Sequence, residues 1–236
     1  MSKKITKEDI LADLILNNSN ILHVIERFSI PLGIENNTVK EICNKYEIPL
    51  EAFITAVNIY NDTAYMPEFT RDFESIPGYL NYLYLSHQYF MGEKIPLIQS
   101  LVEKLLLELN SPKAKTIQTF FSKYIDEVTE HINYENELVF PYIEKLYDHF
   151  KNNIPLQEAK AYSIDIYGAH HSDIEALLMD LKNILIRFVS YKKTSTILRK
   201  VIQNLFELET DLYYHTRLEN EVLIPLVAEL ENEIRH

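Results

Sequence analysis

The sequence is poor in cysteine, glycine and basic residues, and each shortage excludes a class of protein. The single cysteine, Cys43, allows no disulfide framework and no cysteine-based zinc site. Only four glycines in 236 residues favour long helices over many short, tightly turned strands. The 35 acidic residues outnumber the 23 basic ones and give a net charge of −12. That charge argues against binding to nucleic acid or to an anionic membrane surface, since both require a basic face.

Long apolar runs are missing as well. No stretch approaches the ~18 uncharged apolar residues of a membrane-spanning helix. Acidic residues interrupt the apolar residues at the N-terminus, unlike the apolar centre of a signal peptide. Because 47% of the residues are hydrophobic, the chain can still form a sizeable core. We therefore expect a soluble, cytoplasmic protein with one large domain, or one domain and a small appendage.

The spacing of the apolar residues predicts an all-α fold. Apolar residues recur at three- and four-residue steps, which is typical of helices. Short helices are predicted over 6–17, 19–28, 39–47 and 50–60, and long helices over 76–109, 116–150, 156–190 and 194–235. Long helices with short connections predict an up-down-up-down four-helix bundle over residues 67–236. A small helical domain over residues 1–66 precedes it, with a linker over 62–71.

Two kinds of local signal refine these boundaries. Thr38 is expected to cap its helix, with Glu41 at the capping-box position, and Thr194 or Ser195 is expected to cap the last helix. Prolines lie inside three of the long helices, six or nine residues after a candidate ligand, and are expected to kink the helices beyond the site. These prolines are Pro96, Pro141 and Pro225.

Two stretches of the chain, 124–146 and 209–230, repeat the same pattern. Both carry His-x-x-x-Glu-Asn-Glu, two apolar residues and, after one further residue, Pro, and the second copy follows the first at a constant offset of 84 residues. The matched pairs are His131 and His215, Glu135 and Glu219, Asn136 and Asn220, Glu137 and Glu221, and Pro141 and Pro225. His87 and His171 are separated by the same 84 residues. The chain is therefore interpreted as an internal repeat whose shared residues are of metal-ligand type.

The position of these residues on the helices favours a metal site. A His and a Glu four residues apart lie on one face of a helix, and here that face is the apolar stripe that must point to the core. Burial of an unpaired carboxylate costs several kcal/mol, and a shared cation removes that cost. A single core histidine or an exposed His–Glu pair is often only structural, but six such residues at one offset are not. The predicted ligands are His87, His131, Glu135, His171, His215 and Glu219.

This ligand set predicts a dinuclear centre. Two bridging glutamates, two histidines on each metal and a bridging oxygen leave one position open on each ion, and imidazole with carboxylate suits iron or manganese. His170 breaks the offset and lies about 100° round the helix from His171, so it is interpreted as a neighbour of the site or a surface residue. No residue is assigned a catalytic role.

The same segments resemble a known family. HINYENELVFPYI from His131 and HTRLENEVLIPLV from His215 resemble the paired motifs of hemerythrin-like (HHE cation-binding) domains, and look closest to the repair-of-iron-centres branch. YLYLSHQYFMGEKIPLI around His87 and HSDIEALL from His171 are similar to the other two ligand segments of that branch. The resemblance covers roughly residues 73–230, and residues 10–60 resemble a diverged copy of the short helical domain that precedes the bundle.

The resemblance implies a function as well as a fold. It implies two non-haem Fe ions with an oxo or hydroxo bridge, held by the six residues above, and reaction with O2, NO or peroxide. In the repair branch it also implies restoration of damaged iron–sulfur proteins after oxidative or nitrosative stress. The chain departs from that branch where a cysteine pair is usual, because residues 30–34 are Ile-Pro-Leu-Gly-Ile. Some members also carry a further histidine where residues 108–110 are Glu-Leu-Asn.

Two functions from different classes therefore remain open. The first is a stress-response repair protein that returns iron to damaged clusters, with the N-terminal domain docking the damaged protein. The second is an O2- or NO-binding or sensing module without repair activity, whose N-terminal domain transmits the change. An iron-dependent oxidase or peroxidase is a weaker third. The missing cysteine pair favours sensing, and the similarity of the bundle motifs favours repair.

Overall fold

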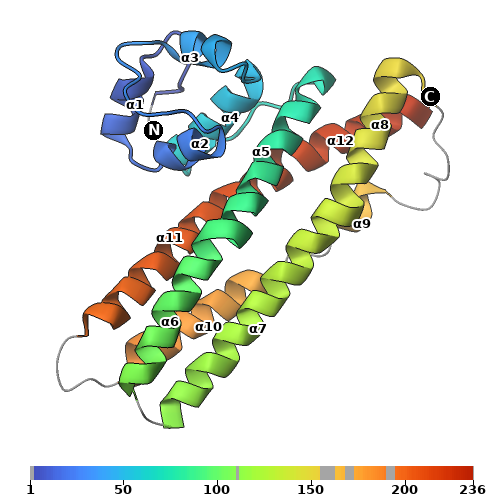
Figure 1. The fold of residues 1–236 in the computed structure, drawn as a ribbon. Helices are drawn as coiled ribbons and strands as arrows, with labels where there is room; N and C mark the ends of the chain where they lie inside the picture. Colours follow the sequence, from blue (N-terminus) through green and yellow to red (C-terminus); the bar gives the residue numbers. More distant parts are fainter. Residues whose placement is uncertain (1–2, 110–111, 155–162, 168–172, 190–194, 236) are drawn as a thin grey trace. The chain divides into compact units, whose positions relative to one another are not determined.

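A computed structural model describes residues 3–109, 112–154, 163–167, 173–189 and 195–235 (Figure 1). Every named element of these residues is a helix, and an isolated bridge pairs Ile10 with Thr38. The predicted all-α fold class is therefore confirmed. The chain divides into two compact units, one drawn from residues 1–86, 140–168 and 214–236 and the other from residues 87–139 and 169–213. None of the described helices is both long and apolar enough to cross a membrane.

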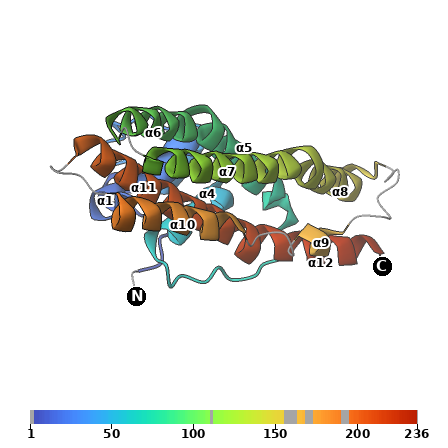
Figure 2. The same ribbon diagram turned by 90° about the horizontal axis from the view of Figure 1, so that it is seen from below.

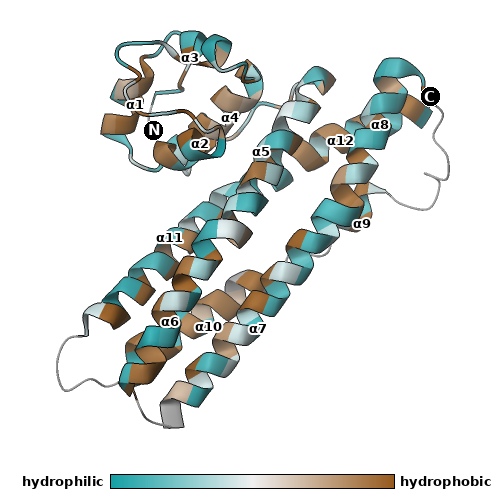
Figure 3. Cartoon of the chain, in the orientation of Figure 1, coloured by the Kyte–Doolittle hydropathy of each residue, from teal (hydrophilic) through white to brown (hydrophobic). Residues whose placement is uncertain are grey.

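The unit formed by residues 87–139 and 169–213 is a bundle of four helices (Figure 2). Its helices are α6 (Ile95–Leu109), α7 (Pro112–Tyr134), α10 (Asp173–Phe188) and most of α11 (Thr196–Leu218). Apolar residues recur every three or four positions along each helix, and Figure 3 shows them in brown among the teal polar residues. The apolar sides meet in one core, which includes Val102, Leu105, Ile117, Phe121, Tyr124, Val128, Leu178, Leu181, Leu185, Val201, Leu205 and Leu208. Burial of these side chains holds the helices together.

The other unit contains the N-terminal helical region. Its short helices are α1 (Leu11–Asn17), α2 (Ile21–Arg27), α3 (Val39–Lys45) and α4 (Leu50–Asn61). The predicted cap of α3 is confirmed, because the Thr38 hydroxyl accepts from the Glu41 N–H and the Glu41 carboxylate accepts from the Thr38 N–H. Residues 62–72 contain no helix, as the predicted linker requires.

The same unit also contains parts of the longer helices. These are α5 (Ile76–Tyr89), α8 (Phe140–Asn152), the single turn α9 (Ile164–Tyr167) and α12 (Ile224–Arg235). Helix α5 packs closely on α4 at Gly78, where an added Cβ would come within 2.9 Å of the Ala52 and Pro49 Cβ atoms. The hydroxyls of Thr55 and Tyr79 also share a hydrogen bond of 3.2 Å between these two helices. The N-terminal helical region therefore rests firmly on α5.

Several predicted helix boundaries were wrong. Helix α7 begins at Pro112, four residues before the predicted start at residue 116. The first helix begins at Leu11 and not at residue 6, because the Asp9 carboxylate accepts from the N–H and hydroxyl of Thr6 and closes a separate turn. The helix predicted over 156–190 is not continuous, because Ser163 is not helical. The buried Glu231 carboxylate accepts from the Ser163 hydroxyl and the Ile164 N–H, which starts α9 there. Residues 155–162 and 168–172 lie outside the described residues. Ser195 is the cap of α11, since its hydroxyl accepts from the Leu198 N–H, while Thr194 also lies outside them.

Within the described residues, three π-helical segments interrupt the long helices, and each ends two residues before an internal proline. They are η2 (Phe90–Lys94), η3 (Glu135–Val139) and η5 (Glu219–Leu223), and they precede Pro96, Pro141 and Pro225. A proline lacks the N–H of the helix ladder and clashes with the carbonyl four residues earlier, which here belongs to the π segment. A wider turn relieves both problems. The prediction that the irregularities lie beyond the site was wrong, because η3 and η5 begin at the candidate ligands Glu135 and Glu219.

Cys43 lies in α3 with only 2% of its surface exposed. Burial raises the pKa of the Cys43 thiol to about 12, so the reactive thiolate forms only far above neutral pH. We expect the native protein to resist alkylation by iodoacetamide at pH 8 and to react once it is unfolded, as measured by intact mass. The variant Cys43→Ser should bind the same amount of metal as the wild type. Rapid labelling of the native protein would contradict the buried position.

Candidate metal centre

The first copy of the repeat places its ligands at the junction of α7 and η3. His131 lies in the last turn of α7, and Glu135 is the first residue of η3. Val128 and Tyr124 occupy the same stripe about one and two turns earlier and are buried in the bundle core. Since the stripe faces the core, the two polar residues that continue it must also turn inward. The helix therefore carries a carboxylate into an apolar interior.

Two imidazoles meet the buried carboxylate of Glu135, one at each oxygen. His131 Nε2 lies 3.1 Å from Glu135 Oε1, and His87 Nε2 lies 3.1 Å from Glu135 Oε2. Glu135 is fully buried and His87 is 2% exposed, whereas the His131 side chain keeps 20% of its surface exposed. Burial alone would raise the pKa of Glu135, but the adjoining imidazoles of His131 and His87 hold that pKa well below its usual value. Glu135 is therefore a carboxylate anion, the form that binds a cation.

Asn136 fixes the orientation of the His87 ring. His87 Nδ1–H donates a 2.8 Å hydrogen bond to Asn136 Oδ1, and an amide oxygen can only accept. In the neutral ring this leaves the lone pair on Nε2, the atom that faces Glu135. Metal-binding histidines in proteins characteristically donate their second N–H to a carbonyl or carboxylate in this way. The His87 ring thus has the tautomer and direction of a metal ligand.

The second copy of the repeat has the same local arrangement. His215 lies near the end of α11, Glu219 opens η5, and His215 Nε2 lies 3.2 Å from Glu219 Oε1. Both residues are buried, with His215 4% exposed and Glu219 fully buried. Four of the six predicted ligands are therefore buried: His87, Glu135, His215 and Glu219. His171 and its neighbour His170 lie outside the described residues.

The donor atoms fit a metal cation. The three spacings of imidazole nitrogen from carboxylate oxygen are 3.1, 3.1 and 3.2 Å. Donors about 2.1 Å from a metal lie about 3.0 Å apart at right angles, as in octahedral coordination, and about 3.4 Å apart in a tetrahedron. Spacings in this range are compatible with nitrogen and oxygen donors that share a cation. A cation would also compensate the buried negative charge of each carboxylate.

Sequence reasoning did not assign a role to Asn136. The signal was present, because Asn136 and Asn220 recur within the repeat beside the two glutamates. The contact to His87 comes from a helix 49 residues away in sequence, and only the packing of the helices shows it. By the same 84-residue offset, Asn220 is the candidate partner of His171.

Comparison with known proteins agrees with the arrangement of these residues. Residues 82–227 match the model of the hemerythrin HHE cation binding domain. Two full-length relatives, each named iron-sulfur cluster repair protein ScdA, come from two strains of Staphylococcus epidermidis. Each is 22% identical to this chain over 228 residues, which cover 95% of this chain and 100% of the relative. Because the domain match spans more than half of its residues, the chain belongs to the hemerythrin HHE cation-binding domain family.

Proposed function

We propose that this protein holds a non-haem di-iron centre, reacts through it with O2, NO or peroxide, and serves in the repair of damaged iron–sulfur clusters. One observation carries the dinuclear part of the proposal. The two oxygens of Glu135 face two different imidazoles, His131 at Oε1 and His87 at Oε2. If His131, His87 and Glu135 bound one metal, a single oxygen of Glu135 would be enough to bind it. A different histidine at each oxygen is the arrangement of a carboxylate that bridges two metals.

The proposed ligand set is the one that the repeat predicts. His87, His131 and Glu135 come from the first copy and the helix before it, and His171, His215 and Glu219 are their counterparts 84 residues later. A pair of irons would supply one-electron redox chemistry and an open coordination position for a small ligand. The chain's own residues would hold the metals, fix the tautomer of His87 through Asn136, and keep the carboxylates of Glu135 and Glu219 buried away from water.

The role in repair is supported by the relatives. Both are named iron-sulfur cluster repair proteins and match this chain over nearly its whole length. The alternative is an O2- or NO-binding or sensing module. A specific observation favours it: the single cysteine is buried in α3, and burial raises the pKa of its thiol to about 12. A relay of iron or NO through a reactive thiol of this chain is therefore not available.

Metal analysis followed by two reactivity assays tests the proposal. Protein made with adequate iron and purified without oxygen should carry about two Fe per chain. Its optical spectrum should change on addition of O2 and, in a separate sample, on addition of NO. Repair is tested by adding the iron-loaded protein to a peroxide-damaged [4Fe–4S] dehydratase and measuring the return of dehydratase activity, with the metal-free protein as control.

The outcomes separate the candidates. Recovery of the damaged dehydratase supports repair, and reaction with either gas without any recovery supports the sensing alternative. Binding of one tightly held zinc and no iron after iron-replete expression would overturn the di-iron assignment.

A further inference from the structure

The two copies of the repeat differ at two positions that touch the N-terminal helical region. Tyr214 and Arg217 flank His215 in the second copy, and the residues 84 positions earlier are Glu130 and Asn133. An aromatic residue and a cation thus replace an acid and an amide beside the second pair of ligands. Tyr214 and Arg217 are buried, whereas Asn133 is exposed. The N-terminal helical region therefore contacts a part of the second copy that has no equivalent in the first.

Arg217 joins the linker to the π segment of the ligand-bearing helix. Its Nε donates to Glu221 Oε1 at 2.8 Å and one terminal nitrogen donates to Glu221 Oε2 at 2.7 Å, a two-pronged ion pair. The same terminal nitrogen donates to the backbone carbonyl of Tyr65, and the other lies 3.5 Å from the carbonyl of Asp62. The guanidinium thus has Glu221 on one edge and the linker on the other. Only 6% of Arg217 is exposed, whereas the Glu221 side chain keeps 25% of its surface exposed.

The end of α4 makes a second contact beside the ligands. The ring of Tyr60 lies 4.5 Å from that of Tyr214, measured between centroids. The side-chain amide of Asn18 donates to the carbonyls of Tyr60 and Asn61 at 3.2 Å, which holds the end of α4 within the N-terminal helical region. Tyr214 immediately precedes His215 in the chain. Movement of the end of α4 would therefore displace Tyr214, which is adjacent to the candidate ligand His215.

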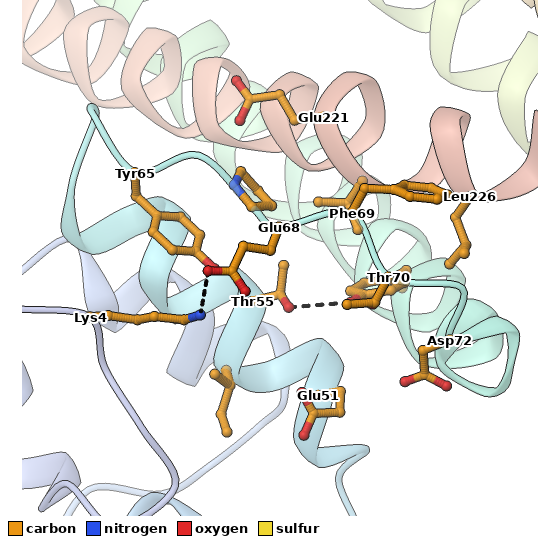
Figure 4. A pocket seen from close by; sticks show the side chains of 14 residues that line it. Lys4, Glu51, Thr55, Tyr65, Glu68, Phe69, Thr70, Asp72, Glu221 and Leu226 are labelled. Atoms are coloured by element: carbon orange, nitrogen blue, oxygen red, sulfur yellow. Dashed lines mark hydrogen bonds and ion pairs between the residues drawn. The ribbon is translucent and has the colours of Figure 1, made fainter.

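Farther along, the linker leaves a hollow beside the same π segment. A pocket of about 130 Å³ is lined by linker residues from Tyr65 to Asp72, by α4 and by the segment that includes Glu221 and Leu226 (Figure 4). Figure 4 shows the Glu221 carboxylate on the helix above the linker. The linker is thus held to the ligand-bearing helix at Arg217 but is not packed against it along its whole length. Nearer the end of the linker, Arg71 forms ion pairs with Glu229 and Glu233 of α12.

We propose that Arg217 is a positioning residue that couples the N-terminal helical region to the retention of metal by His215 and Glu219. Arg217 lies two residues after His215 and two before Glu219, and its partner Glu221 belongs to the π segment that Glu219 opens. The ion pair fixes the outer side of that segment, and the linker carbonyls fix the guanidinium. Release of the linker makes segment η5 more mobile and lowers the affinity with which Glu219 binds its metal. The first copy, with Asn133 and an exposed Glu137, has no such control.

Thermodynamic linkage makes this coupling reciprocal. If the position of the linker changes metal affinity, metal binding must stabilise the linker by the same free energy. Metal should therefore slow amide hydrogen exchange in residues 60–65, although none of them is a predicted ligand. A role of Arg217 in packing alone would protect these amides equally with and without metal. This inference rests on the proposed metal centre, and it adds a route from that centre to the N-terminal helical region.

Hydrogen exchange and metal release in the full-length protein test the coupling. Exchange in residues 60–65 is followed by mass spectrometry with and without anaerobic Fe²⁺, and release of iron to a chelator is followed in parallel. In the wild type we expect slower exchange with Fe²⁺ and slow release of both irons. In Arg217→Gln the Fe²⁺-dependent protection should disappear, and one of the two irons should leave about tenfold faster. Arg217→Lys should recover part of both effects, because it keeps the charge but not the two-pronged geometry.

Two further variants keep the test decisive. Glu221→Gln breaks the ion pair while leaving Arg217 on the linker carbonyls, so it carries the test if Arg217→Gln does not fold. Glu137→Gln, the matched change in the first copy, should behave as wild type. Suppose that the wild type binds two irons, while Arg217→Gln and Glu221→Gln keep the Fe²⁺-dependent protection and the wild-type rate of iron release. The proposed coupling is then wrong, and the proposed metal centre is unaffected. If the wild type binds no iron, both are wrong.

Discussion

Replacement of Glu135 by alanine is expected to abolish binding of the metal pair and to have the largest effect of any single substitution at the centre. Glu135 is fully buried, and its two oxygens each face a histidine nitrogen at 3.1 Å. The variant removes the anion that both imidazoles contact and, in the proposed centre, the bridge between two metals. The free energy of metal binding also stabilises the folded state. The wild type should therefore lose much of its thermal stability when the metal is removed. Glu135→Ala should gain no thermal stability from added iron.

The effect on the metal-free protein can be measured separately. Loss of one partner from a buried ionic pair costs about 3–5 kcal/mol, because the remaining groups are left uncompensated in the core. Urea unfolding of metal-free Glu135→Ala should show a decrease of that order in the free energy of unfolding. Glu137→Ala is the matched control, since Glu137 lies two residues away in the same π segment but is exposed. Two irons per chain in Glu135→Ala, with wild-type spectra, would show that Glu135 is not a ligand.

Much of the fold could be predicted because its signals are local. The apolar steps of three and four residues indicate helices wherever they occur, and the Thr38–Glu41 capping box needs only residues three apart in sequence. The first helix was predicted to begin at residue 6, but Thr6 and Asp9 close a turn of their own before it. Ser163 interrupts the third long helix through Glu231, a residue 68 positions away. Distant partners of this kind leave no local pattern.

The candidate ligands were predicted from a signal of a different kind. A constant offset between His and Glu residues is a long-range signal that a single sequence can carry. It led to His87 and His131, whose Nε2 atoms each lie 3.1 Å from one oxygen of Glu135. The π segments were missed because a helix of period 3.6 was assumed through the prolines. The available signal was that Pro141 and Pro225 each follow a candidate ligand glutamate by six residues. A proline that removes the ladder hydrogen bond next to a buried ligand favours a π segment at that ligand.

Arg217 illustrates the opposite kind of signal. The repeat directs attention to what the two copies share, while the contacts of the N-terminal helical region involve what they do not share. Tyr214 and Arg217 stand where the first copy has Glu130 and Asn133. Within a repeat, conservation of a residue type between copies indicates the common chemistry, and a departure indicates a contact that only one copy makes. Reading the departures would have pointed to Arg217 from the sequence alone.

The second large effect is expected at His171, where the repeat makes a prediction beyond the described residues. His87 and His171 share the 84-residue offset, and so do their candidate partners Asn136 and Asn220. His87 faces one oxygen of Glu135 and donates its other ring N–H to Asn136. If the second copy follows the first, His171 faces Glu219 and donates to Asn220. His171→Ala should therefore lose at least one iron and much of the thermal stability that iron confers.

His170→Ala is the matched control, because it removes an imidazole one residue away while leaving the offset intact. We expect this variant to keep both irons and the wild-type melting temperature. Asn220→Ala should fall between the two, since loss of a partner that orients a ligand typically lowers metal affinity by about 10–100-fold without removing the ligand. Iron content and melting temperature, measured side by side for the three variants, decide the matter. Loss of iron in His170→Ala and its retention in His171→Ala would show that the chain slips by one residue in the third ligand helix, and that the offset fails there.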